Sequence, residues 1–403
     1  MKYGEIVNKI KSSDSDVVLF GAGVLGKIAL YALNQAGIKV KCFCDNDKSR
    51  QGKKYCGIGI ISPKELLKLN SETIIFLSNS YIDSVRSQLK GTKFHNVFDC
   101  VSILENTDFS NFNLDLNIIE IERQIALYKS LCVKPDNTGN YIDMKYIDVV
   151  VTERCSMRCR DCSNLMQYYK APQNCDIGLL FKSIDKLMGC IDRLHEFRVI
   201  GGEPFMNTEL DNILSGLLKY GNADKIVILT NATIVPNNKM LETLKNKKIV
   251  MFVTNYGKKS KKYGELLERL KENGIQYVVN PVGKWTDSGK IKYQEKTEDE
   301  LRQMFADCCV NNTMTLLNGK LFRCPFSAHA TNLGAIPVFG GEIVDLNEGI
   351  NNPNALKKNI LELYNDKKYL RACFYCNGRD FTTAKIPPAI QAKEPLEYKK
   401  VAP

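Results

Sequence analysis

Three cysteines stand close together in the segment VTERCSMRCRDCSN, residues 151–164. Cys155, Cys159 and Cys162 are separated by three and two residues, whereas the whole chain holds only three histidines. Structural zinc sites take four protein ligands, often as two pairs, and nothing near these thiols completes such a set. Iron–sulfur clusters are also held by thiolates, normally four. A four-iron cluster held by only three thiolates would leave one iron open to another ligand.

A second group of cysteines lies toward the C-terminus. Nine residues, a glycine and four further residues separate its first two members, and a CxxC pair follows. The four members are Cys309, Cys324, Cys373 and Cys376. Two pairs of thiols suit a zinc ribbon or a fully ligated iron–sulfur cluster. Cys308 adjoins Cys309, so the first ligand is ambiguous, and the spacing favours Cys309.

The CX3CX2C triplet and the segment GGEP, residues 201–204, together resemble the motifs of the radical S-adenosylmethionine (radical SAM) enzymes. The resemblance covers roughly residues 145–305. It implies that the triplet holds a 4Fe–4S cluster, that the methionine part of SAM chelates the open iron, and that reduction yields a 5′-deoxyadenosyl radical. In this family the loop formed here by Gly201, Gly202 and Glu203 binds the methionyl amino group through backbone oxygens and the carboxylate. Glycines suit such a loop because backbone without a Cβ can approach a ligand closely.

Two later segments, LTNAT and VTNYG, end predicted strands and resemble the family's polar strand ends that contact the SAM ribose and carboxylate. The candidates are Thr230, Asn231, Thr254 and Asn255, each of which also fits a helix cap or a turn. The family usually has an aromatic residue before the third cysteine, near adenine. This chain has Asp161 there.

The C-terminal thiols resemble the SPASM and twitch auxiliary-cluster domains. No cysteine follows Cys376, so the shorter twitch form is expected, with a second 4Fe–4S cluster on the four thiols named above. The other cysteines are expected to be core or surface thiols. His95, His195 and His329 form no spaced cluster and are expected to be structural.

A glycine-rich loop near the N-terminus follows a short apolar run. Gly21, Gly23 and Gly26 stand between a predicted strand and a predicted helix, the usual setting for a phosphate at a helix N-terminus. Asp45 ends the second strand, where a ribose-binding acid is expected. NAD is one candidate ligand. A nucleotide sugar is favoured by resemblance to the N-terminal Rossmann-like domain of bacterial sugar acyltransferases, and a purely structural domain is the third interpretation.

Alternating apolar and amphipathic segments must position these residues. Strands are predicted at 17–20, 38–44, 73–77 and 96–99, and again at 146–152, 197–200, 225–229, 249–254 and 276–280, with helices between them. Such alternation indicates parallel sheets with ligand sites at the carboxyl ends of the strands. The expected α/β fold is a Rossmann-like domain over 1–102, a helical linker over 103–144, a partial (β/α)6-type radical SAM barrel over 145–305 and a twitch-like domain with its tail over 306–403. The segment 134–140 is predicted to be a turn-rich linker.

Composition excludes several other classes of protein. No apolar run approaches the roughly 18 residues that span a membrane, and the N-terminus does not read as a secretory signal. Fifteen cysteines without such a signal favour a cytoplasmic protein with reduced thiols. A net charge of +11 is spread along the chain; it favours small acidic substrates, and no basic module indicates nucleic acid.

The expected function is a radical SAM enzyme, oxidoreductase-like, that abstracts hydrogen from a carbohydrate or nucleotide-linked sugar. Dehydrogenation or epimerisation would follow, with flavodoxin or ferredoxin as the electron donor. The catalytic base is not identifiable, and Tyr256 and Asp287 are only candidates. A radical SAM peptide maturase is the alternative, although such enzymes commonly begin with a winged-helix domain rather than a glycine loop. A non-catalytic metal- or nucleotide-binding protein is the third possibility.

Overall fold

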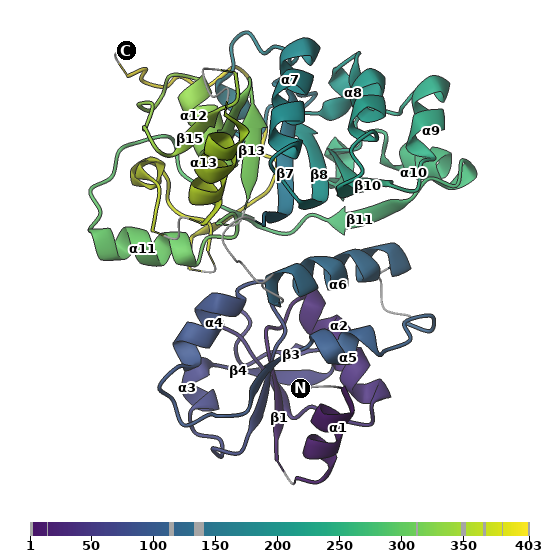
Figure 1. Ribbon diagram of the computed structural model, residues 1–403, viewed down its shortest axis with the longest axis vertical. Helices are drawn as coiled ribbons and strands as arrows, with labels where there is room; N and C mark the ends of the chain where they lie inside the picture. Colours follow the sequence, from purple (N-terminus) through teal and green to yellow (C-terminus); the bar gives the residue numbers. More distant parts are fainter. Residues whose placement is uncertain are drawn as a thin grey trace. The chain divides into compact units, whose positions relative to one another are not determined.

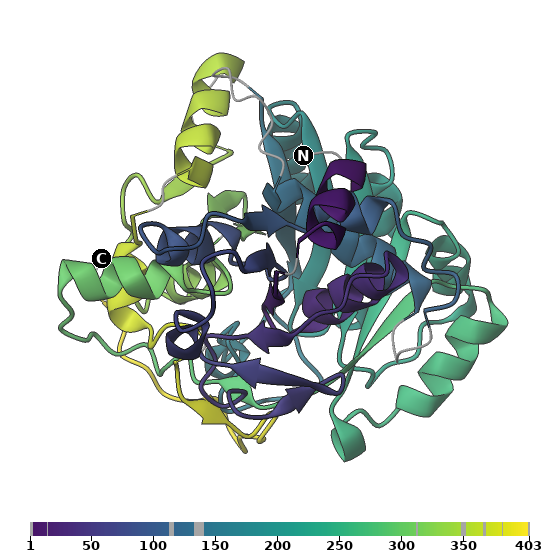
Figure 2. The same cartoon turned by 90° about the horizontal axis from the view of Figure 1, so that it is seen from below.

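The computed structural model describes residues 3–13, 15–112, 117–132, 141–311, 313–347, 352–365, 368–380 and 382–401. The chain divides into two compact units, Met1–Lys134 and Pro135–Pro403. The first is coloured from purple to blue and the second from teal through green to yellow (Figures 1 and 2). Within the described ranges, no helix combines the length and the apolar character needed to cross a membrane. The predicted linker over 134–140 lies outside those ranges.

The first unit is built on a six-stranded sheet of order β3-β4-β2-β1-β5-β6. All neighbours are parallel except the antiparallel pair β3 and β4. The strands are β1 (Val17–Phe20), β2 (Cys42–Cys44), β3 (Lys54–Tyr55), β4 (Ile58–Ile61), β5 (Ile74–Leu77) and β6 (Val97–Asp99). The helices are α1 (Tyr3–Lys11), α2 (Val24–Gln35), α3 (Pro63–Leu66), α4 (Ile82–Leu89), α5 (Val101–Glu105) and α6 (Ile118–Cys132). Strands β1 and β5 are buried at every residue, as expected for central parallel strands.

The expected helical linker over 103–144 is wrong in its role. Helices α5 and α6 pack onto the first unit through Ile103, Leu104, Ile121 and Tyr128, all buried in its core. The phenol oxygen of Tyr128 also accepts a hydrogen bond from the Cys100 backbone at 2.9 Å. Apolar residues at helical spacing bury themselves against the nearest sheet, so helices α5 and α6 belong to the first unit.

The second unit is built on an eight-stranded sheet of order β11-β10-β9-β8-β7-β13-β14-β15. Strands β7 to β11 and β13 pair in parallel, and β14 and β15 are antiparallel. They are β7 (Asp143–Thr152), β8 (Arg193–Gly201), β9 (Ala223–Thr230), β10 (Ile249–Asn255), β11 (Tyr277–Pro281), β13 (Met314–Leu317), β14 (Lys320–Phe322) and β15 (Ile343–Asp345). A further small pair joins β12 (Trp285–Thr286) to β16 (Lys385–Ile386).

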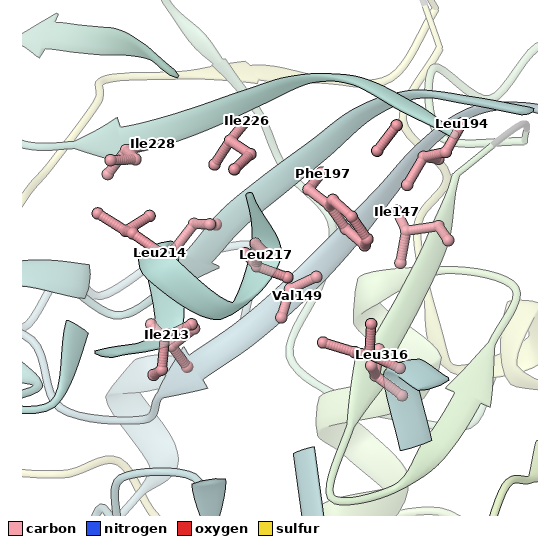
Figure 3. Packing of buried hydrophobic residues seen from close by; sticks show 14 of the residues in the cluster. Ile147, Val149, Leu194, Phe197, Ile213, Leu214, Leu217, Ile226, Ile228 and Leu316 are labelled. Atoms are coloured by element: carbon pink, nitrogen blue, oxygen red, sulfur yellow. The ribbon is translucent and has the colours of Figure 1, made fainter. Parts of the chain in front are cut away.

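Helices pack against one face of this sheet. Ile147, Val149 and Phe197 pack with Leu214 and Leu217 of a neighbouring helix in one continuous core (Figure 3). The described α-helices of this unit are α7 (Ile177–Met188), α8 (Leu210–Leu217), α9 (Asn238–Leu244), α10 (Tyr263–Glu272), α11 (Glu298–Ala306), α12 (Pro325–Asn332) and α13 (Pro353–Asn365). All of them except α11 and α12 contribute buried residues to this core. Because side chains alternate along a strand, the residues between these apolar positions face the opposite side of the sheet.

The predicted boundary at residues 305 and 306 does not separate two compact units. Strand β13 pairs in parallel with β7, with Met314 opposite Ile147 and Leu316 opposite Val149. The segment after residue 306 therefore extends the sheet that carries the cysteine triplet. Its short strand gave no pattern strong enough to predict this pairing.

Two of the glycines in the N-terminal loop are required by packing. A Cβ at Gly26 would lie 2.1 Å from the carbonyl oxygen of Gly21, and Gly21 itself has φ +125 with a Cβ position 2.7 Å from the Ser78 carbonyl. Gly23 differs, because its nearest neighbour would be an Arg50 guanidinium nitrogen at 3.9 Å.

We therefore expect Gly26→Ala to destabilise the first unit by about 1–3 kcal/mol, the usual range for overpacking. Gly23→Ala serves as the matched control and should cost less than about 1 kcal/mol, because its Cβ enters open space and only the preference of glycine over alanine at a helix N-cap is lost. Urea unfolding of the full chain, followed by circular dichroism, measures both. Equal stability of the two variants would contradict the close approach between Gly26 and Gly21.

Candidate functional site

A cavity of about 350 Å³ lies at the carboxyl ends of the parallel strands of the second unit. It gathers segments far apart in sequence, namely the loop after β7, the loop after β8 and the ends of β9 and β10. The predicted site residues that line it are Cys155, Cys159, Cys162, Gly201, Gly202, Thr230, Asn231 and Thr254. The structure thus brings the triplet together with most of the predicted SAM contacts.

Each thiol of the triplet accepts hydrogen bonds from nearby N–H groups. The Cys155 sulfur accepts from the Met157 backbone at 3.4 Å and from the Asn231 amide at 3.7 Å. The Cys159 sulfur accepts from the Gln391 amide at 3.2 Å. Burial raises the pKa of Cys159 to about 11 and that of Cys162 above its ordinary value. The free thiols are therefore protonated at neutral pH, and a bound cation would displace the protons.

The GGEP loop is held against the strand that leads into the triplet. The amide of Gly202 donates to the Thr152 carbonyl at 3.0 Å, and the amide of Glu203 donates to the Arg154 carbonyl at 2.8 Å. A Cβ at Gly201 would lie 2.2 Å from the Thr152 carbonyl oxygen, and a Cβ at Gly202 would lie 2.2 Å from the Arg154 carbonyl oxygen. Glycine is therefore required at both positions by the backbone packing itself, before any ligand is considered.

Glu203, whose carboxylate is predicted to contact SAM, is not among the residues that line the cavity. Its side chain is fully buried and accepts hydrogen bonds from the Thr230 hydroxyl at 2.9 Å and from the backbone amide of Asn231 at 2.8 Å. Burial raises its pKa to about 7, although these two donors lower it in part. The carboxylate positions the end of β9 from behind the cavity wall.

Two other predicted residues also have local roles in turns. Asn255 accepts the Gly257 amide at 2.8 Å, and Asp287 accepts the Gly289 amide at 3.0 Å. Neither is among the residues that line the cavity. Tyr256, the other candidate base, does line it and packs edge-on against Trp285, with ring centroids 5.8 Å apart.

The inner wall of the cavity carries two charged residues that the sequence did not single out. Asp148 of β7 and Arg198 of β8 lie next to each other, with 3.5 Å between carboxylate oxygen and guanidinium nitrogen. That oxygen of Asp148 is buried without a hydrogen bond. The sequence did contain a signal for these two residues, because each is a charged residue among apolar residues in a predicted strand. Alternation along the strand places such a residue on the face of the sheet opposite the helices.

The C-terminal thiols surround a second, smaller cavity of about 30 Å³. The cysteines that line it are Cys308, Cys324, Cys373 and Cys376. This differs from the predicted set, because Cys309 is exposed and does not line the cavity. The spacing of the cysteines could not show which of the adjacent residues Cys308 and Cys309 is the ligand. In the turn after α11, Cys308 lies at the cavity and Cys309 is exposed to solvent.

The two cavities share part of their lining. Val310 and Arg379 line both, and the Arg379 Nε is buried without a hydrogen bond. The nearby thiols Cys309, Cys308, Cys376 and Cys324 raise the pKa of Arg379 against the effect of burial. The triplet's cavity and the cavity of the C-terminal thiols therefore adjoin at these two side chains.

The glycine loop of the first unit is held by its own side chains. The Asp45 carboxylate accepts the Ala22 amide at 2.8 Å and lies 3.9 Å from Arg50. The Tyr55 hydroxyl donates to the Gly23 carbonyl at 3.2 Å. Asp45 thus supports the loop, and Arg50 is the cationic side chain beside the open position of Gly23.

The predicted structural histidines have local partners in the second unit. His195 pairs with Asp143 at 2.8 Å, and His329 pairs with the Tyr169 hydroxyl at 2.9 Å. Across the described ranges, no three His, Cys, Asp or Glu side chains are grouped so that they could hold a single metal ion.

Comparison with known proteins gives partial matches. The family described as "C2185-like, N-terminal" matches residues 13–98. The GTP 3′,8-cyclase of Clostridium acetobutylicum is 30% identical over 102 residues, which are 25% of this chain and 31% of that protein. The enzyme of the same name from Helicobacter pylori is 30% identical over 114 residues, which are 28% and 33% of the two chains. This chain thus spans about a third of the length of these curated relatives.

Solved structures give weaker likenesses. BtrN in complex with AdoMet and 2-DOIA is 18% identical, with a TM-score of 0.37 over 59% of this chain and 95% of that one. SuiB of Streptococcus suis bound to S-adenosylmethionine is 13% identical, with a TM-score of 0.32 over 61% and 72% of the two chains. Scores of this size do not establish a shared fold.

The surroundings of the C-terminal thiols predict selective alkylation of the metal-free protein. A hydrogen bond from Cys308, with Arg379 and Lys385 nearby, lowers the pKa of Cys309 below that of an ordinary thiol. Its thiolate is the reactive form and is therefore more populated near neutral pH than in an ordinary cysteine. We expect iodoacetamide at pH 7 to modify Cys309 well before Cys56, the other exposed cysteine, whose pKa is raised by partial burial. Peptide mass spectrometry over time measures the order, and faster labelling of Cys308 than Cys309 would contradict it.

Proposed function

We propose that this protein is a radical SAM enzyme whose catalytic cluster is bound by Cys155, Cys159 and Cys162. The observation that carries the proposal is the convergence of these thiols with the GGEP glycines and the polar strand ends in one cavity. Sequence similarity to the GTP 3′,8-cyclases over about a quarter of the chain supports it. A bound 4Fe–4S cluster would supply one electron to cleave SAM and release the 5′-deoxyadenosyl radical.

The residues around the triplet suit such a cluster. Thiolates that accept N–H groups from backbone and side-chain amides are typical of iron–sulfur sites, whose potentials depend on these hydrogen bonds. Thr230, Asn231 and Thr254 offer hydroxyl and amide groups on the wall beside the glycines. We assign them to the ribose and methionyl groups of SAM, with Glu203 fixing Thr230 and Asn231 from behind.

The proposed substrate is a carbohydrate or a nucleotide-linked sugar. Asp148 and Arg198 place a hydrogen-bond acceptor and several donors on the cavity wall, as hydroxyl-rich molecules require. The name of the curated relatives assigns their chemistry to the 3′ and 8 positions of GTP, and the former is a ribose carbon. In a dehydrogenation, SAM held in this cavity would supply the group that removes one hydrogen atom from a carbinol carbon of the substrate. The substrate would then lose one proton to a base and one electron to an acceptor, which would leave a ketone.

That electron acceptor is proposed to be an auxiliary 4Fe–4S cluster on Cys308, Cys324, Cys373 and Cys376. Backbone amides donate to two of these sulfurs, from Ser327 to Cys324 at 3.2 Å and from Gly378 to Cys376 at 3.4 Å. Arg379 stands between this site and the substrate cavity, where its positive charge favours the reduced form of a nearby cluster.

The first unit is proposed to bind a nucleotide or a nucleotide sugar at its glycine loop. Gly23 leaves open space at the N-terminus of α2, and Arg50 offers a positive charge beside it. A flavodoxin or ferredoxin is the proposed source of electrons for SAM cleavage.

Iron analysis tests the two-cluster proposal. Anaerobically reconstituted wild type should hold about eight irons, from two four-iron clusters. Replacing the triplet with Ala should leave about four irons and abolish 5′-deoxyadenosine formation, because the open iron is lost. Cys308→Ala should also leave about four irons but retain SAM cleavage, whereas Cys309→Ala should retain about eight. Zinc in the C-terminal site, or loss of iron only in Cys309→Ala, would refute the assignment.

The role of Glu203 gives a separate test. Removing an acceptor from a buried network leaves its donors unpaired, at a cost of about 1–3 kcal/mol. Glu203→Gln should therefore weaken SAM binding by about tenfold, which corresponds to about 1.4 kcal/mol. If Glu203 acts by holding β9, Thr230→Val should weaken binding similarly and the double variant should add little. Isothermal titration with SAM measures all three, and fully additive losses would indicate that Glu203 contacts SAM directly.

A further inference from the structure

The segment after β16 lies along the cysteine loop. The Arg160 amide donates to the Ile390 carbonyl at 2.7 Å, and the Ala392 amide donates to the Arg158 carbonyl at 2.7 Å. Between these two bonds, Cys159 and Gln391 form an antiparallel bridge. The segment therefore pairs with the loop as a short strand, at a separation of 232 residues in sequence.

The Gln391 amide is held in one orientation by three partners. Its oxygen accepts the Arg158 backbone amide at 2.8 Å, and its nitrogen donates to the Ala389 carbonyl at 2.9 Å and to the Cys159 sulfur at 3.2 Å. The opposite orientation would place the amide oxygen against the Ala389 carbonyl and its nitrogen against an N–H donor. The backbone contacts thus aim an N–H bond at the sulfur.

The same segment also limits the exposure of this thiol. Ala389 is 2% exposed and packs with Met157 and Cys159, which is itself 8% exposed. A left-handed backbone at Ala389, with φ 54, turns the chain into this position. A non-glycine residue rarely adopts this conformation, so the contacts around it must hold it there.

We propose that Gln391 is a positioning residue of the SAM-binding cluster, which donates a hydrogen bond to the Cys159 ligand while the buried Ala389 covers that thiol. This inference rests on the proposed cluster at the triplet. A hydrogen bond to a ligand sulfur stabilises the reduced cluster more than the oxidised one, because the reduced form carries one more negative charge. Gln391 therefore raises the reduction potential of the cluster that must deliver an electron to SAM.

The test is an anaerobic redox titration of the reconstituted full-length protein, followed by electron paramagnetic resonance. The signal that changes on addition of SAM identifies the cluster of the triplet. In Gln391→Ala, the ratio of reduced to oxidised cluster at a fixed potential should fall at least threefold, or about 28 mV at 59 mV per tenfold for one electron. In Gln391→Glu, a carboxylate faces the sulfur and the fall should reach about tenfold, or about 59 mV.

Lys393→Ala provides the matched control, since it removes one positive charge from the same exposed segment without touching the sulfur. Its potential should stay within the error of the wild type. Loss of iron to a chelator is the second measurement. It should be about tenfold faster in both Gln391 variants, in keeping with the usual effect of losing a hydrogen bond to a metal ligand.

The outcomes separate this inference from the proposed function. A wild-type protein without a cluster signal that responds to SAM would overturn the proposed function itself. A normal wild-type signal with unchanged potential and iron loss in both Gln391 variants would overturn the role of Gln391 alone. An equal shift in Lys393→Ala would reduce the effect to general surface charge and would also overturn it.

Discussion

Parallel pairing across strands β7 to β10 is the constraint on which the candidate site depends. Because these strands run in the same direction, the segments that follow them all emerge at one edge of the sheet. Pairing of Val199 with Ile228, and of Val253 with Thr230, fixes how far each polar end projects. A slip by one residue would exchange the two faces of a strand, so that Asp148 or Arg198 would enter the apolar core. The register therefore determines both the packing of the helices and the composition of the cavity.

The wall of the cavity depends on a close approach between two backbone segments and on one buried carboxylate. Gly201 and Gly202 allow the loop after β8 to touch the loop after β7, and Glu203 connects it to the end of β9. A buried carboxylate is costly unless its oxygens are paired. Here the hydrogen bonds offset part of that cost and join adjacent strand ends, so the arrangement favours one geometry of the wall. Rigid support of this kind is what a binding site for a small flexible cofactor requires.

Much of this architecture follows from local patterns in the sequence. The strand at 17–20 agrees with β1 at both ends, and those at 73–77 and 249–254 agree with β5 and β10 to within one residue. Short apolar runs rich in β-branched residues and flanked by glycine and polar residues are typical of buried strands in an α/β fold. The triplet and the GGEP loop were identifiable because their chemistry depends on neighbours in the chain.

The features that were missed depend on distant contacts. Nothing local distinguishes Cys308 from Cys309, and Asp148 and Arg198 acquire meaning only when β7 and β8 pair. The helical segment predicted as a linker was misassigned because an amphipathic sequence pattern does not indicate which sheet the helix packs against. Gln391 lies in a tail of lysines and prolines whose partner is a loop in the middle of the chain.

The distance in sequence between Cys159 and Gln391 has a consequence for synthesis of the protein. A ribosome adds about 5–20 residues per second, so the 232 residues between them take on the order of 10 to 50 s to appear. For most of that interval the triplet lies outside the ribosome while the strand that later pairs with its loop does not yet exist. The nascent chain thus leaves that side of the proposed cluster site open. Emergence of the segment around Gln391 then closes the same side, without any separate conformational switch.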